Sequence, residues 1–172
     1  MKKQIGIVVL VFCISLFGCN RDYRMYTDSD KRFSVKYPKS WIVKPGGQAG
    51  IAVTFESPME GLSDNFLDNF SITAGSVPSS MTAEDFAHAT MEAPKSYIPK
   101  FKIMEEKKSI ISGAEAFSVV YEGDLAGEKF IWKQVFFVKK GQGYSVIFTL
   151  SADKAVQYDA EIKESIASFR IL

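Results

Sequence analysis

The chain has 172 residues, with 21 basic and 20 acidic side chains and a formal net charge of +1 at pH 7. That length fits one domain with a sizeable buried core. The near-neutral charge, without a basic cluster in the sequence, excludes a typical nucleic-acid-binding protein and argues against electrostatic docking to anionic lipid.

The N-terminal stretch has the pattern of a lipoprotein signal peptide. Two lysines precede an apolar run of thirteen residues from Ile5 to Phe17, and Leu16-Phe17-Gly18-Cys19 resembles the bacterial lipobox. As a helix this run spans about 20 Å, whereas the hydrocarbon core of a bilayer is about 30 Å thick. We therefore predict that residues 1–18 are removed and that Cys19 carries lipid. The mature protein would be extracytoplasmic, anchored on the periplasmic or cell-surface face of a bacterial membrane.

Cysteine usage follows from this prediction. Cys13 leaves with the signal peptide and Cys19 is acylated, so the mature domain has no free thiol, disulfide or cysteine metal ligand. Loss of Lys2 and Lys3 leaves 19 of the 21 basic residues against 20 acidic ones. The stability of the domain therefore has to come from packing, and no cofactor is expected.

The first half of the mature chain is predicted to contain a tether, three strands and a helix. Residues 19–31 are polar and are expected to be a lipidated tether to a domain over residues 32–172. Alternating apolar residues then predict strands beginning near Phe33, Ile51 and Phe70. Thr82-Ala83-Glu84-Asp85 is typical of a capped helix start. The helix is expected to end near Ala93, because Pro94 disfavours helical backbone in the residue before it.

The second half is predicted to contain four successive strands and a final helix. The strands are expected at about 102–111, 115–122, 129–139 and 144–151, with turn sequences between them. The third has apolar residues at consecutive positions, so it needs cover on both faces. The final helix carries one apolar stripe, formed by Tyr158, Ile162, Ile166 and Phe169. The expected fold class is α+β, an antiparallel β-sheet meander sandwiched between helices, with Phe137, Phe148, Ile162 and Ile166 in the core.

Four motifs carry a family resemblance. They are Phe33-Ser34-Val35-Lys36-Tyr37-Pro38 followed by Trp41; Asp68-Asn69-Phe70-Ser71-Ile72; Lys133-Gln134-Val135-Phe136-Phe137-Val138; and Gly143-Tyr144-Ser145-Val146. Through these motifs the sequence resembles the PsbP-like family from about Lys31 to Leu172. That family includes an extrinsic protein of the photosystem II oxygen-evolving complex and many bacterial lipoproteins. The resemblance implies an α/β/α sandwich and, in a photosynthetic host, an accessory role with a photosystem protein as partner.

The sequence offers little support for catalysis. His88 is the only histidine, and a Gly-x-Ser-x-Gly motif is absent from the sequence. A catalytic triad needs a nucleophile and an orienting acid, which nothing around His88 supplies. We therefore expect His88 to be a surface or packed helix residue and the protein to be non-enzymatic. An envelope hydrolase or a small-ligand-binding lipoprotein is the alternative, with Asp64 and Asp68 among many acids able to pair.

One loop carries both the metal candidates and most of the partner-binding candidates. Its oxygen-bearing side chains, Glu56, Glu60, Asp64, Asn65, Asp68 and Asn69, do not have the spacing of an EF-hand. No metal is therefore expected, with Asp64 and Asp68 kept as weak calcium candidates against simple solvation. Leu62, Phe66 and Leu67 either pack on their own loop or form an interaction surface. Together with Leu125, at a predicted hairpin tip, they are the candidate residues for binding an envelope or photosystem protein.

Overall fold

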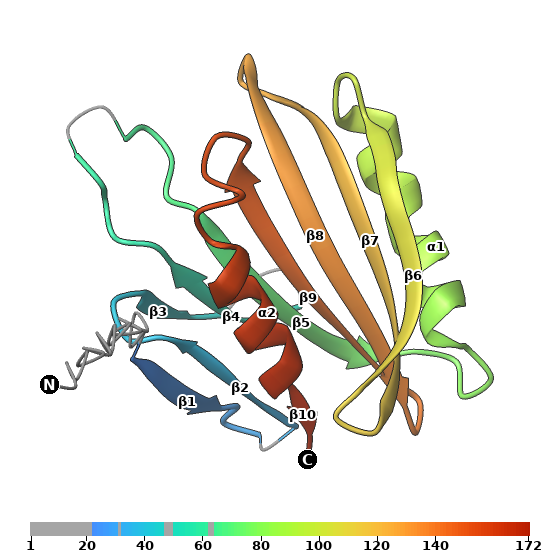
Figure 1. The fold of residues 1–172 in the computed structure, drawn as a ribbon. Helices are drawn as coiled ribbons and strands as arrows, with labels where there is room; N and C mark the ends of the chain where they lie inside the picture. The colour runs from blue at the N-terminus through green and yellow to red at the C-terminus, as the bar shows by residue number, and fades with distance from the viewer. Residues whose placement is uncertain (1–21, 31, 47–49, 62–63) are drawn as a thin grey trace, which may run out of the picture.

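The computed structural model describes residues 22–30, 32–46, 50–61 and 64–172. The strands and helices follow one another along the chain as shown in Figure 1. They are β1 (Tyr23–Thr27), β2 (Phe33–Pro38), β3 (Ile42–Pro45), β4 (Ile51–Glu56), β5 (Asn69–Ser76), α1 (Ala83–Tyr97), β6 (Lys102–Ile111), β7 (Ala114–Leu125), β8 (Glu128–Lys139), β9 (Gln142–Ser151), α2 (Asp159–Ser168) and β10 (Arg170–Ile171).

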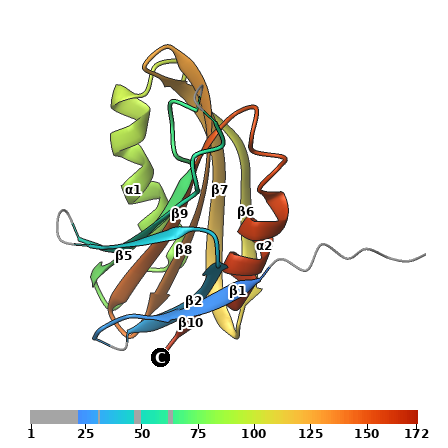
Figure 2. The same ribbon diagram turned by 90° about the vertical axis from the view of Figure 1, so that its left-hand side faces the viewer.

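A seven-stranded antiparallel sheet divides the domain into two apolar layers. Its strand order is β3-β4-β5-β9-β8-β7-β6, so β6 to β9 form the predicted meander and α1 connects β5 to β6. Helix α1 covers one face, while α2 and a three-stranded sheet of order β1-β2-β10 cover the other (Figure 2). The structure is therefore α+β, with the main sheet lying between the two helices as predicted.

Strand β8 is buried on both faces, which explains its consecutive apolar residues. Phe130 and Phe136 belong to the cluster under α1, which also contains Met91 of that helix. Val135 and Phe137 point to the opposite cluster, which contains Ile162 of α2. Because successive side chains of a strand alternate between faces, one strand supplies both cores. The prediction that this strand needs cover on both faces is confirmed.

Aromatic rings connect α2 to the rest of its layer. Phe169 stacks on Phe137, with ring centroids 4.7 Å apart, and Tyr158 meets Trp41 edge to face at 5.4 Å. Trp41 is buried in this layer. The apolar stripe of the helix is confirmed except at Ile166, which is only partly buried.

Residues Tyr23–Thr27, predicted as part of a polar tether, form strand β1 instead. The strand pairs antiparallel with β2 along its whole length, from Tyr23 opposite Pro38 to Thr27 opposite Ser34. The ring of Tyr26 packs edge to face on Phe55 at 5.4 Å. Pairing with β2 and the ring of Tyr26, which also lies 6.2 Å from that of Phe33, hold this segment in the fold. The folded domain therefore begins near Tyr23 and not at residue 32.

Helix α1 also departs from prediction at its end. Its start has the expected capping box, in which Asp85 N–H donates to Thr82 Oγ1 at 3.1 Å and Thr82 N–H donates to Asp85 Oδ2 at 3.0 Å. The helix continues past Pro94 to Tyr97. Pro94 is buried, and because it lies in the last turn its missing N–H costs only one helical hydrogen bond. The burial of Pro94 itself and the hydrogen bond that its carbonyl accepts from Ile98 N–H at 2.9 Å stabilise this last turn.

Two strands were not predicted because they are short. Strand β3 ends at Pro45, which an edge strand tolerates because one side of its backbone needs no partner. Strand β10 has two residues, paired with Ser34 and Phe33 of β2. Within the described ranges of the chain, none of the helices is long and apolar enough to cross a membrane.

Candidate functional site

A pocket of about 560 Å³ opens where the β4–β5 loop (57–68) meets the β9–α2 loop (152–158). Its lining is mostly polar and charged: Glu60, Asp64, Asn65, Phe66, Glu128, Lys129, Ser151, Ala152, Asp153 and Lys154. The antiparallel pairing of β5 with β9 places Asn69 opposite Thr149, so the loops adjoining these two positions meet at one end of the sheet. The acidic residues singled out in the sequence therefore face a second loop.

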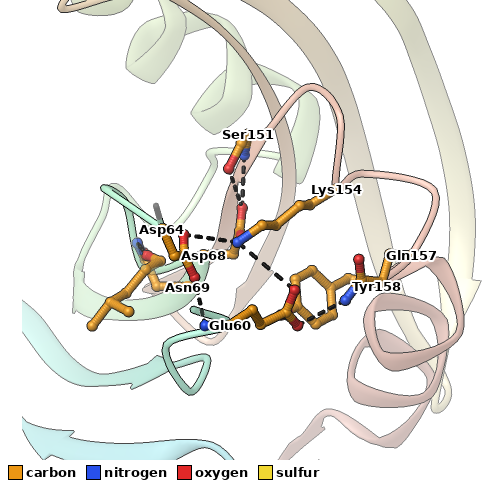
Figure 3. A network of polar contacts seen from close by, with 9 residues as sticks. Glu60, Asp64, Asp68, Asn69, Ser151, Lys154, Gln157 and Tyr158 are labelled. Atoms are coloured by element: carbon orange, nitrogen blue, oxygen red, sulfur yellow. Dashed lines mark hydrogen bonds and ion pairs between the residues drawn. The ribbon is translucent and has the colours of Figure 1, made fainter. Parts of the chain in front are cut away.

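Lys154 lies at the centre of this site, surrounded by three carboxylates (Figure 3). Its Nζ is 2.8 Å from Asp64 Oδ1, 3.5 Å from Asp68 Oδ2 and 3.9 Å from Glu60 Oε2. The side chain is only 15% exposed. Burial alone would lower the pKa of Lys154, but the hydrogen bond to Asp64 and the charges of Asp68, Asp64 and Glu60 raise it. The ammonium is thus held in its charged form.

Asp68 connects the site to the end of β9. Its Oδ1 accepts hydrogen bonds from Ser151 N–H at 2.7 Å and Ser151 Oγ–H at 3.0 Å. Its backbone carbonyl accepts from Ser57 N–H at 2.7 Å, which closes the base of the β4–β5 loop. The side chain is fully buried, and this burial raises the pKa of Asp68 despite the opposing effects of Ser151 and Lys154.

Glu60 connects the site to the start of α2. Its Oε1 accepts from Tyr158 Oη and from Gln157 Nε2, both at 2.7 Å, while its N–H donates to Asp64 Oδ2 at 2.9 Å. The hydrogen bonds from Tyr158 and Gln157 lower the pKa of Glu60. Burial, followed by the hydrogen bond to Glu60, raises the pKa of Tyr158. The carboxylate therefore stays ionised and the phenol stays protonated.

These pKa directions distinguish the site from a typical acid–base catalyst. Catalysis near neutral pH needs a carboxyl pKa raised toward 7 or a lysine pKa lowered toward it. Glu60 and Asp64 are shifted down and Lys154 is shifted up, so all three are driven toward the charged state. Asp68 is shifted up, but both of its oxygens already face partners. The arrangement is suited to holding two loops together.

The weak calcium candidates Asp64 and Asp68 both face the Lys154 ammonium. A positive charge therefore already lies among the oxygens that a cation would need. The neighbouring candidates are engaged elsewhere, since Glu56 pairs with Lys44 and Asn69 Nδ2 donates to the carbonyl of Leu67. In the part of the chain that the structure describes, no three acidic, histidine or cysteine side chains converge as a metal site would require.

His88 lies on α1, apart from the carboxylates of the β4–β5 loop. Its side chain is 56% exposed, and Nε2 is 3.8 Å from Glu106 Oε1 on β6. The imidazole ring meets Phe117 edge to face at 5.5 Å. These contacts are those of a surface helix residue resting on the adjoining strands.

The apolar candidates of the β4–β5 loop are placed differently from one another. Leu62 lies outside the described residues, as does Cys19. Phe66 meets Phe130 edge to face at 4.7 Å and joins the margin of the α1 cluster, while Leu67 is partly buried. Leu125, the last residue of β7, is 46% exposed. Among the three candidates that the structure describes, Leu125 is the most exposed.

Several exposed apolar side chains lie toward the same end of the domain as the pocket. Four connections gather at the upper end of Figure 1, and we call them together the loop end. They are the β4–β5 loop, the β9–α2 loop, the α1–β6 connection (98–101) and the β7–β8 turn (126–127). Of nine exposed large apolar side chains among the described residues, five lie in these connections or in the element ends beside them. They are Met59, Tyr97, Met104, Leu125 and Val156.

The residues that complete the site were not found from the sequence. Lys154, Ser151 and Tyr158 are more than eighty residues from the acids they contact. Ser151 ends strand β9, and Lys154 and Tyr158 follow it. In the sheet β9 lies beside β5, although the two strands are far apart in the sequence. Only the order of strands in the sheet brings these residues to the loop acids.

Comparison with known proteins gives one family. The model of the PsbP-like protein family matches residues 19–171. No curated protein matches the sequence.

Several solved structures share the fold at low sequence identity. Cyanobacterial PsbP (CyanoP) from Synechocystis has a TM-score of 0.64 and 16% identity, over 99% of this chain and 98% of that one. LpqN of Mycobacterium tuberculosis, described as involved in cell envelope biogenesis, has a TM-score of 0.66 and 11% identity, over 87% of this chain and 90% of that one. The Saccharomyces cerevisiae Ran-binding protein Mog1p has a TM-score of 0.57 and 10% identity, over 88% and 96%. At these identities the likeness shows the fold alone.

Proposed function

Because the chain belongs to the PsbP-like family, we propose that it is a lipid-anchored, extracytoplasmic binding protein that holds another envelope component at its loop end. The signal-peptide pattern that ends at Cys19 supports the anchor. Lipid on Cys19 would keep the domain at a membrane surface. Its activity would consist of binding and not of chemical conversion.

The clustering of exposed apolar side chains at the loop end carries this proposal. Met59 and Val156 lie in connections, Leu125 is the last residue of β7, and Val156 is 85% exposed. Large apolar side chains that stay exposed toward one end of a domain are candidates for an interaction surface. The Lys154 ion pairs hold two of the loops in place, so a partner would meet a preorganised surface and lose less entropy on binding.

Known proteins with this fold are compatible with a binding role. Mog1p is a Ran-binding protein, and LpqN is involved in cell envelope biogenesis. For a photosynthetic host, the likeness to cyanobacterial PsbP supports an accessory role at photosystem II. For any other host, we propose an envelope protein as the partner.

A small-ligand-binding role is the second candidate, and the pocket favours it. About 560 Å³ is enough for a small molecule, and the charged lining would select a polar one. The ion pairs argue against hydrolysis, because the Lys154 ammonium holds Asp64 and Asp68 within 2.8 and 3.5 Å as charged partners.

Replacing the acylated residue tests the anchor. In Cys19→Ser cells the protein should accumulate as an unprocessed precursor or as an unanchored protein, because the acylation site is gone. Membrane fractionation with metabolic acyl labelling measures both outcomes. Normal labelling and membrane recovery of this variant would contradict lipidation at Cys19.

A further inference from the structure

We propose that the β2–β3 turn and the beginning of β3 lie against the bilayer that holds the anchor. The proposal rests on lipidation of Cys19 in the proposed function, and it adds an orientation of the domain to that function. The surface involved consists of Lys39, Ser40 and Ile42, called here the membrane edge.

The distance from the lipid to the folded domain is short. Three residue steps separate Cys19 from Asp22, and a fully extended chain covers about 11 Å in that number of steps. Asp22 is already part of the fold, because its carbonyl oxygen accepts a hydrogen bond from Lys39 N–H at 2.8 Å. The next residue, Tyr23, pairs with Pro38. The acylated residue therefore cannot move far from the β2–β3 turn.

The surface at this point suits the interface of a membrane. Asp22, Lys39 and Ser40 line the same hollow, of about 380 Å³, and both turn residues are exposed. Ile42 follows at the edge of the main sheet with 54% of its side chain exposed. An exposed aliphatic side chain beside a lysine fits the boundary between headgroups and acyl chains, because the lysine stem packs on apolar groups while its ammonium stays in water.

Charge does not drive this contact. Lys39 Nζ is 3.5 Å from Asp22 Oδ2, and Lys44 of β3 pairs with Glu56, so the cations of this edge are balanced by neighbouring carboxylates. The short length of chain between Cys19 and Asp22 is thus what keeps this edge at the membrane. The contact should therefore depend little on anionic lipid or on salt.

The same geometry places the far edge of the sheet away from the membrane. Strands β3 and β6 form opposite edges of the seven-stranded sheet. Six spacings of about 4.8 Å between adjacent strands amount to about 29 Å. Strand β6, with its exposed charged residues, is therefore directed toward the aqueous side.

Site-specific quenching tests the orientation. The acylated protein is purified with Ser40→Cys or with Lys107→Cys on β6 and labelled with bimane, since the thiol of Cys19 is blocked by lipid. Each protein is incorporated into neutral phosphatidylcholine vesicles that contain a headgroup spin-labelled lipid. We expect several-fold stronger quenching at position 40 than at position 107, unchanged by salt.

A longer tether provides the matched control. Twenty Gly/Ser residues inserted after Asn20 add a random-coil reach of about 25 Å, and this should reduce the quenching at position 40 to the level at position 107. Equal quenching at the two positions without the insertion would overturn the orientation. Failure of lipidation is a separate result, because an unacylated protein would not float with the vesicles at all.

Discussion

Lys154 Nζ lies 2.8 Å from Asp64 Oδ1, at the point where the β9–α2 loop crosses the β4–β5 loop. The same ammonium lies 3.5 Å from Asp68 Oδ2, which is fully buried. Carboxylates gathered in a loop typically suggest a bound cation, and here a lysine from a distant part of the chain supplies the positive charge. The network therefore links the two loops through Asp64, Asp68 and Lys154.

Removal of this ammonium should destabilise the domain. Lys154→Met keeps most of the aliphatic stem but leaves the buried Asp68 carboxylate without its opposite charge. Exposed ion pairs contribute up to about 1 kcal/mol, whereas breaking a buried pair costs about 3 to 5, so a loss of about 2 kcal/mol is expected for this partly buried one. Urea unfolding at pH 7 measures it.

The control for this variant is Lys163→Met. Lys163 pairs with Asp159 one helical turn away, and its side chain is 67% exposed. Its replacement should change the free energy of unfolding by less than about 0.5 kcal/mol. Equal losses in the two variants would show that the Lys154 network does not hold the loops.

Calcium should have no effect on the wild-type protein through this loop. The Lys154 ammonium lies among the oxygens of Asp64 and Asp68 and repels a divalent cation. Thermal unfolding with millimolar CaCl₂ should therefore match unfolding with EDTA, whereas Lys154→Ala should gain melting temperature from calcium. A calcium-dependent rise in the wild type that Asp64→Asn abolishes would restore the loop as a metal site.

Stability should depend on pH through Asp68. Its pKa in the folded state is raised above the ordinary value of 3.8, mainly by burial. A group with a raised pKa binds its proton more tightly in the folded state. Its contribution to the free energy of unfolding is therefore fully present below pH 3.8 and is lost as the pH rises through the raised pKa. The side chain of Asp68→Asn does not titrate, so the stability of this variant lacks that dependence on pH.

The measurable quantity is the difference in unfolding free energy between Asp68→Asn and wild type, followed by urea titrations from acid pH upward. We expect this difference to shift in favour of the variant as the pH increases. A shift in favour of wild type would mean that attraction to Lys154 outweighs the cost of burying the carboxylate.

The core can be tested at Phe137. Its ring is buried between β8 and α2 and stacks on Phe169. Phe137→Ala should lower the free energy of unfolding by about 3 to 5 kcal/mol, from lost apolar transfer and the resulting cavity. Ile110→Ala, at a side chain that is 68% exposed, should have little effect. Similar melting temperatures for both variants would show that this layer is not the core.

Local patterns were sufficient to predict most of the fold. Period-two alternation located β2, β4 and β5, and the capping box located the start of α1, because these signals depend on neighbouring residues. Strand β1 was missed because its pairing with β2 and the Tyr26–Phe55 contact, both tertiary, stabilise it. Pro94 was misleading because its own side chain is buried, which offsets one lost hydrogen bond in the last turn of α1.

The candidate site was only half predicted. Its acids were visible as a cluster in one loop, but the charge that completes the cluster comes from Lys154 across the sheet. Phe66 was expected either to pack on its own loop or to form an interaction surface, because its actual partner, Phe130, belongs to a later strand. In both cases the missing information was the adjacency of segments far apart in the sequence.

Capture of a partner tests the binding role most directly. Crosslinked pull-downs from native membranes would compare wild type, His88→Ala, Ile110→Ser and a loop-end variant that combines Met59→Ser, Leu125→Ser and Val156→Ser. All substituted apolar residues are exposed, so the fold should remain intact. Phe66 is left unchanged because it packs on Phe130. Exposed apolar anchors typically carry most of the binding energy of an interface.

We expect wild type, His88→Ala and Ile110→Ser to capture the same envelope protein in equal amounts, and the loop-end variant to capture several-fold less. Suppose instead that the loop-end variant captured as much partner as wild type, while His88→Ala lost the function of the protein in the cell. The binding role would then be wrong, and an enzymatic role would have to replace it.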